Sequence, residues 1–150
     1  MSDAFASTQW PPTPISSEVK HLLSRFLEIV DLEDEKAGQL LADEVFTSDG
    51  ELVASTGSFH GADVLFLEIA RSRENAWKVV DYRHHVIDKV FAGNKDGTDL
   101  ILVGRLETRT KDSSNTTITE FAAKALVDTS KPSGPRLKLW AAYIGNSNAL

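Results

Sequence analysis

The sequence predicts an α+β domain in which helices come first and a long antiparallel sheet follows. Apolar residues recur at helical spacing in the first part of the chain, whereas four runs of strand length and composition fill the last part. The chain has 150 residues, 41% of them hydrophobic, which suits one domain with a core of its own. We expect a single domain over residues 16–145, between a Pro-rich flexible tail (1–15) and a short C-terminal tail (146–150).

The composition argues against several classes of function. The chain has no cysteine, which removes disulfides, thiolate metal ligands and thiol nucleophiles. Its net charge of −6 argues against a nucleic-acid surface, because phosphate binding needs a concentrated positive field. No apolar stretch approaches the roughly 20 residues of a membrane span, and the amino terminus does not resemble a secretory signal. We therefore expect a cytoplasmic protein with no nucleic-acid or membrane partner.

The amino-terminal segment ends in three prolines that follow Trp10 closely. Prolines favour an extended chain, so this segment is predicted to be a tail, and docking of Trp10 on the domain is an equally open alternative. A helix is expected from Ser16 or Ser17, either of which can cap it, to Val30. Its apolar residues recur on one face.

Four further elements are expected before the long strands. Residues 31–35 form an acidic break, and a second helix then turns its apolar residues inward. The composition of residues 47–50 is typical of a turn. Two short strands follow at residues 51–55 and 57–59, and a third helix at 62–79. The inward residues of the second helix are Ala37, Leu40, Leu41 and Val45.

Residues 84–91, 100–108, 117–127 and 136–144 are predicted to form four strands, and the short turns between them indicate an antiparallel meander. The second and third of these strands are apolar at both odd and even positions, so both faces of the sheet need to be covered. Three helices can cover one face. We expect a second copy of the chain to cover the other, in a homodimer through the outer sheet face.

The opening helix, with Glu18, Leu22 and Phe26, resembles that of bacterial ketosteroid isomerases. Gly50 before a strand, Gly61 before the third helix and the closing meander fit the wider nuclear-transport-factor-2-like superfamily, which includes SnoaL-like polyketide cyclases and scytalone dehydratase. The resemblance covers residues 16–145. It implies a SnoaL-like α+β roll, in which a cone-shaped curved antiparallel sheet wraps over three N-terminal helices. It also implies an apolar cavity in which members of the superfamily bind a ligand or catalyse a reaction without a cofactor. Such proteins are usually dimers.

The catalytic residues of ketosteroid isomerases are missing from this sequence. Phe26, Ala54 and Ala123 stand where the resemblance places a tyrosine, a general base and a second acid. None of these side chains can donate or accept a proton, so no enolate would be stabilised. We therefore expect a different reaction, or none.

Candidate acid–base residues lie in one stretch. Adjacent strand residues point to opposite faces, so only one of His84 and His85 can face a cavity. The resemblance to SnoaL-like proteins favours His84 with Asp88, whereas alignment to scytalone dehydratase favours His85. Imidazole can both take and give a proton near neutral pH. No spacing of histidines matches a metal site, so we expect no metal, and the resemblance implies that no cofactor is needed.

Trp140 lies on the last strand and offers a flat apolar wall with one N–H group, which would suit a polycyclic ligand. Packing in the core or at the dimer interface is an equally open alternative for it. The candidate ligand-binding residues are Trp140, Phe26, Phe121, Leu102, Ile144 and Tyr82.

The expected function is cofactor-independent isomerisation, cyclisation or dehydration of a hydrophobic small metabolite, polycyclic or like a polyketide or terpenoid, as in secondary metabolite biosynthesis. In this hypothesis His84 or His85 is the acid–base group and Asp88 orients the ligand. The alternatives are a binding module without chemistry and a dimerisation platform of the same fold.

Overall fold

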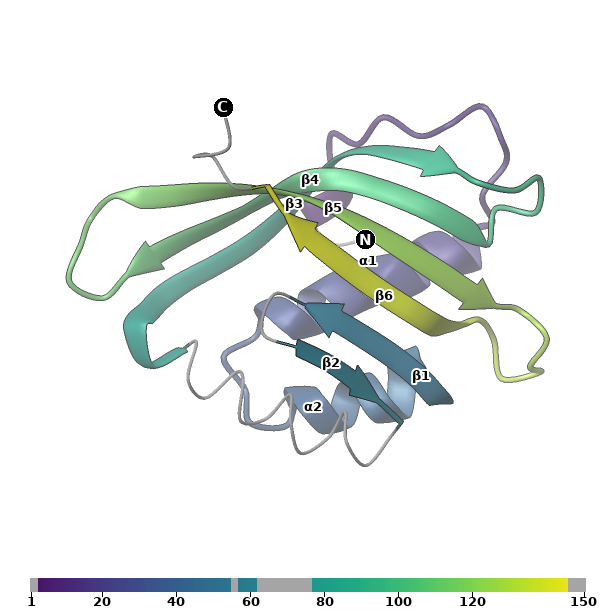
Figure 1. The fold of residues 1–150 in the computed structure, drawn as a ribbon, viewed down its shortest axis with the longest axis horizontal. Helices are drawn as coiled ribbons and strands as arrows, with labels where there is room; N and C mark the ends of the chain where they lie inside the picture. Colours follow the sequence, from purple (N-terminus) through teal and green to yellow (C-terminus); the bar gives the residue numbers. More distant parts are fainter. Residues whose placement is uncertain (1–2, 55–56, 62–76, 146–150) are drawn as a thin grey trace.

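Six strands among the described residues form one curved sheet (Figure 1). The computed structural model describes residues 3–54, 57–61 and 77–145. The strands lie in the order β2-β1-β6-β5-β4-β3. The predicted meander is confirmed, and each of its strands lies within a few residues of the expected range. The bounds are β1 (Phe46–Ala54), β2 (Gly57–His60), β3 (Val80–Ala92), β4 (Asp99–Thr110), β5 (Thr116–Asp128) and β6 (Arg136–Ile144).

The sheet is mixed, because β1 and β6 run parallel while the other neighbours run antiparallel. The expected antiparallel pairing holds among the described strands except at this pair, which no hairpin joins. The predicted turn at residues 47–50 was also wrong, because β1 runs through it with an irregularity between Phe46 and Glu51. Gly50 fits here because a Cβ atom would lie only 2.9 Å from the Phe46 ring.

The first two helices form as predicted. In α1 (Ser17–Asp31), the Ser16 side chain accepts the Val19 N–H group at 3.2 Å and caps the helix. The second helix consists of α2 (Ala37–Leu40) and a π-helical turn (Leu41–Val45), and its apolar residues face the core. The predicted third helix lies outside the described residues except for residues 77–79, which are helical. None of the described helices is long and apolar enough to cross a membrane.

The core lies between α1 and the concave face of the sheet (Figure 1). Phe26 of α1 packs its ring 4.5 Å from the ring of Trp140 on β6, and Phe46 meets Phe26 edge-on at 5.9 Å. Burial of such large rings dominates the energetics of a small core. This layer holds the helix against the strands that carry the candidate site residues.

Residues of the N-terminal segment pack against the edge of β3. The Gln9 N–H group donates to the Asp88 carbonyl at 2.9 Å, and the Gln9 carbonyl accepts the Val90 N–H group at 3.0 Å. Phe5 is buried and stacks on Trp10, with ring centroids 5.5 Å apart. Of the two alternatives for Trp10, the structure shows the docked one.

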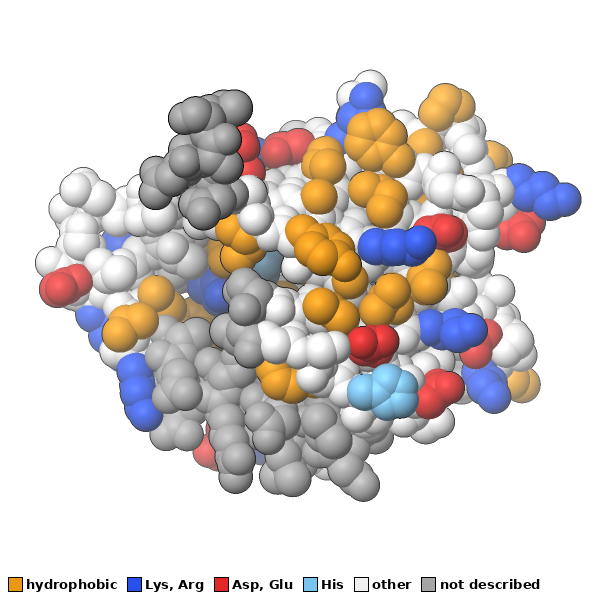
Figure 2. Space-filling model, in the orientation of Figure 1, with side chains coloured by type: hydrophobic (Ala, Val, Ile, Leu, Met, Phe, Trp, Pro, Cys, Tyr) orange, Lys and Arg blue, Asp and Glu red, His pale blue; other side chains and the backbone are white. Residues whose placement is uncertain are grey.

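The outer face of the sheet mixes apolar and charged side chains. Figure 2 shows hydrophobic side chains gathered over β4, β5 and β6, with acidic and basic side chains among them. Tyr143 and Ile118 are the most exposed large apolar residues of these strands, at 64% and 60%. Exposed apolar side chains gathered on one face are typical of interaction surfaces.

Candidate active site

The site begins with an acidic residue in an unfavourable position on its helix. Asp31 is the last residue of α1, where the helix dipole disfavours a negative charge. Its side chain is nevertheless only 13% exposed. A buried carboxylate at this end of a helix needs donors from elsewhere in the fold.

His85 on β3 supplies two of these donors. Its backbone N–H group donates to Asp31 Oδ2 at 2.8 Å, and its ring Nδ1 lies 2.6 Å from Asp31 Oδ1. A carboxylate can only accept, so Nδ1 carries a hydrogen, and Nε2 keeps its lone pair whenever the ring is neutral. Within the described part of the chain, Nε2 has no hydrogen-bond partner. The pair therefore presents an oriented base.

The strand register explains why His85 points inward. His85 and Ile87 share a face of β3, and Ile87 is completely buried. His85 lies opposite Leu106 of β4. The ring of Phe121 on β5 meets the imidazole edge-on at 5.5 Å. The histidine is 12% exposed, between apolar side chains on one side and Asp31 on the other.

Two more basic side chains lie near Asp31. The Arg83 Nε atom is 3.6 Å from Asp31 Oδ1, and the His84 Nδ1 atom is 3.9 Å from Oδ2. Burial lowers the pKa of Arg83, and the charge of Asp31 opposes this shift. Three basic side chains thus place a nitrogen between 2.6 and 3.9 Å from Asp31, although only Arg83 and His85 lie on the inner face of β3.

The structure places neither His84 nor Asp88, the pair that the SnoaL-like resemblance favoured, on the inner face of the sheet. Asp88 lies on the outer face, 51% exposed, in an ion pair with Arg105. His84 and His85 do point to opposite faces, and His85 is the one on the inner face beside Asp31. The alternation itself ends at a bulge between Ile87 and Lys89, which moves Lys89 to the outer face, against the expected pattern.

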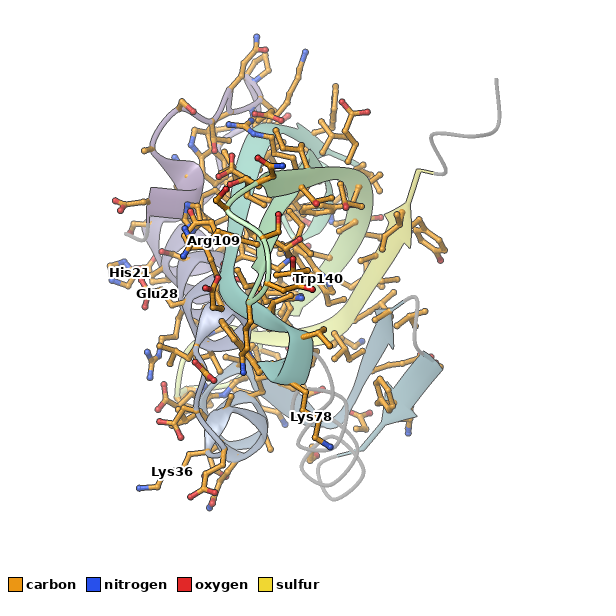
Figure 3. The ribbon with its side chains drawn as sticks, turned by 90° about the vertical axis from the view of Figure 1, so that its left-hand side faces the viewer. His21, Glu28, Lys36, Lys78, Arg109 and Trp140 are labelled. Carbon is orange, nitrogen blue, oxygen red and sulfur yellow. The ribbon has the colours of Figure 1, made fainter. Side chains whose placement is uncertain are left out.

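The predicted ligand-binding residues fall into three groups. Phe26, Trp140 and Leu102 are core residues, and Figure 3 shows Trp140 inside the molecule, while His21 and Glu28 project from α1 on the other side of the helix. Phe121 contacts the imidazole. Ile144 and Tyr82 are exposed at 49% and 36%, and Arg109 lies over the Tyr82 ring at 5.6 Å. Their roles in ligand binding stay predictions.

The molecular surface is hollowed near the C-terminal end of β6 (Figure 2). In this hollow, Figure 2 shows histidine atoms beside hydrophobic and basic side chains. Among the residues described, no group of three or more histidines and acids is arranged to hold a metal ion. The imidazole of His85, oriented by Asp31, is a group that can accept a proton at Nε2.

No protein-family model matches the sequence, and no curated protein matches it. Solved structures do resemble the fold. A hexachlorocyclohexane dehydrochlorinase (LinA, type 2) has a TM-score of 0.64 at 13% identity, covering 87% of this chain and 84% of its own. A candidate scytalone dehydratase from Novosphingobium aromaticivorans has a TM-score of 0.65 at 13% identity, covering 86% of this chain and 83% of its own. A nuclear-transport-factor-2-like protein from Salmonella enterica has a TM-score of 0.63 at 13% identity, covering 89% of this chain and 92% of its own.

These similarities show that the chain has the nuclear-transport-factor-2-like fold, the cone that the resemblance implied. Sequence reasoning did not assign a role to Asp31, which it placed in an acidic break. One signal was available: Asp31 directly follows the apolar stripe of α1, where the dipole favours a basic residue instead.

Proposed function

We propose that this protein is a cofactor-independent enzyme that removes a proton from a carbon atom of a small hydrophobic molecule. His85 is the base and Asp31 its partner. The observation that carries this proposal is the 2.6 Å contact between His85 Nδ1 and Asp31 Oδ1 in a pair that is largely buried. Two of the similar structures are named for the loss of hydrogen chloride or of water, which favours an elimination.

The proposed reaction uses the lone pair on His85 Nε2. Nε2 takes the proton, the electrons of the broken C–H bond form a double bond, and the leaving group departs with its bonding pair. The imidazolium that forms is stabilised by Asp31, which also prevents the ring from turning. The imidazolium then protonates the leaving group or water. An isomerase or cyclase would share the first step and return the proton to another atom.

The surroundings of His85 favour an apolar ligand. Two rows of inner-face residues cross the sheet beside it. In the first, His85 is followed by Leu106 and Thr119, and in the second, Ile87 by Gly104, Phe121 and Ile144. Apolar walls with a few aimed polar groups are typical of small-molecule sites.

We also propose that the outer sheet face pairs two copies of the chain. Support comes from the exposed apolar residues of this face, Tyr143 and Ile118 among them. Sedimentation should show a dimer that Tyr143→Asp dissociates, whereas Leu32→Asp, at an exposed apolar residue outside the sheet, should leave it intact. A monomeric wild-type protein would contradict this proposal.

Elimination of 5-nitrobenzisoxazole tests the base directly, because its ring opens when a base removes its C–H proton and the product is coloured. The wild-type protein should accelerate this reaction, and His85→Gln should abolish most of the acceleration. His21→Gln, which removes an exposed histidine of α1, should leave it unchanged. Equal rates for wild type and His85→Gln would favour the non-catalytic binding module over the enzyme.

A further inference from the structure

Arg83 lies on the same inner face as the proposed base, one strand repeat away. It stands opposite Thr108 of β4, and Thr108 stands opposite Thr117 of β5. Thr119 occupies the same face in the next row, across Leu106 from His85. The inner face therefore changes from apolar at Phe121 to polar at these threonines, with one guanidinium among them.

The positive charge of Arg83 is incompletely compensated within the described residues. Its counter-ion is Asp31, but both oxygens of Asp31 already accept hydrogen bonds from His85. The 3.6 Å separation from Arg83 Nε exceeds a hydrogen-bond length. No described acceptor lies within hydrogen-bond distance of the guanidinium, whose side chain is 26% exposed. A partly buried guanidinium with unused donors is a strong site for an anion.

We infer that Arg83 determines which ligands the site accepts, by pairing with a negatively charged group on an otherwise apolar molecule held beside His85. This inference rests on the proposed function and narrows its substrate class to apolar molecules that carry, or develop, a negative charge. A carboxylate, a sulfonate or a phenolate has the required chemistry.

The charge balance of the site agrees with this assignment. When the rings of His84 and His85 are neutral, the charges of Asp31 and Arg83 cancel. After His85 takes the proton, these residues carry a net charge of +1. Negative charge on the ligand then lies beside a positive site, where a fixed guanidinium stabilises it without reorganisation. Arg83 would thus act on binding and on the developing charge together.

Two fluorescent probes with one skeleton separate charge from apolar contact. 1-Anilinonaphthalene-8-sulfonate carries a sulfonate, and N-phenyl-1-naphthylamine is its neutral counterpart. Arg83→Gln should weaken binding of the sulfonate by about tenfold or more, the worth of one charge-assisted hydrogen bond. Binding of the neutral probe should not change. The matched control is Arg109→Gln, which removes an exposed guanidinium paired with Asp81 and should change neither affinity.

The outcomes distinguish this inference from the proposed function. Equal affinity of wild type and Arg83→Gln for the sulfonate would overturn the inference, whatever the elimination rates of the His85 variants. Equal weakening of both probes would also overturn it, because a structural role predicts that result. Circular dichroism checks each variant for folding. If Arg83→Gln does not fold, Arg83→Lys should still prefer the sulfonate over the neutral probe, and loss of that preference in the folded Lys variant would overturn the inference.

Discussion

Replacing Asp31 with asparagine removes a charge and almost no volume. Asp31 accepts two hydrogen bonds from His85, at 2.6 and 2.8 Å. A hydrogen bond to a charged group contributes about 1.5–3 kcal/mol, and a neutral one about 1 kcal/mol. The amide has one acceptor oxygen, so Asp31→Asn loses one bond, worth about 1.5–3 kcal/mol, and weakens the other by about 0.5–2 kcal/mol, or about 2–5 kcal/mol together. If this stabilisation is lost from the imidazolium that forms in the transition state, the rate falls by about 30- to 5,000-fold.

The assay is the initial rate of 5-nitrobenzisoxazole elimination at fixed protein concentration, compared among wild type, Asp31→Asn and Glu33→Gln. Glu33 is exposed just beyond the end of α1, so its substitution removes the same charge without touching His85. We expect the wild-type rate for Glu33→Gln. A rate for Asp31→Asn as high as that of Glu33→Gln would refute the reasoning, because it would mean that the carboxylate does not assist the base.

Three other predictions concern the scaffold around the site. Gly104→Ala should lower the free energy of unfolding by about 1–3 kcal/mol, because a Cβ atom would collide with the facing β3 backbone, whereas Gly145→Ala should have little effect in the same urea titration. Phe5→Ala should lower the free energy of unfolding by about 3–5 kcal/mol, because the residue is only 3% exposed. A urea midpoint equal to that of the wild-type protein would show that the N-terminal segment adds no stability. The Arg25 guanidinium lowers the pKa of Glu44, so this carboxylate should stabilise the fold at pH 7 and lose that effect as the pH falls below its ordinary range. Glu44→Gln should therefore lower stability at pH 7 by at most about 1 kcal/mol, because both side chains are exposed, and should match wild type in acid.

Local patterns in the sequence were sufficient to predict the long elements. The α1 helix is amphipathic and capped by Ser16, and each strand of the meander is bounded by turn residues, so neighbours in sequence determine these elements. The turn predicted at residues 47–50 failed because pairing of β1 with β6, distant in sequence, outweighed local composition.

The candidate site was harder to predict because its parts are far apart in the sequence. Alternation along β3 showed that only one of His84 and His85 faces inward, but not which one. The answer depends on Asp31, which is 54 residues away from His85 and meets it only when α1 packs under the sheet. The bulge after Ile87 could not be read from composition either, because it lies where Gly104 of the neighbouring strand comes close to the β3 backbone, a contact between residues distant in sequence.

The nitrogen-15 NMR spectrum of the His85 ring tests the central claim most directly, because it reports which ring nitrogen carries the hydrogen. In the neutral ring of the wild-type protein, the account predicts a protonated Nδ1 and an unprotonated Nε2. A neutral ring protonated at Nε2 would contradict it, since that nitrogen could then accept no proton from a ligand.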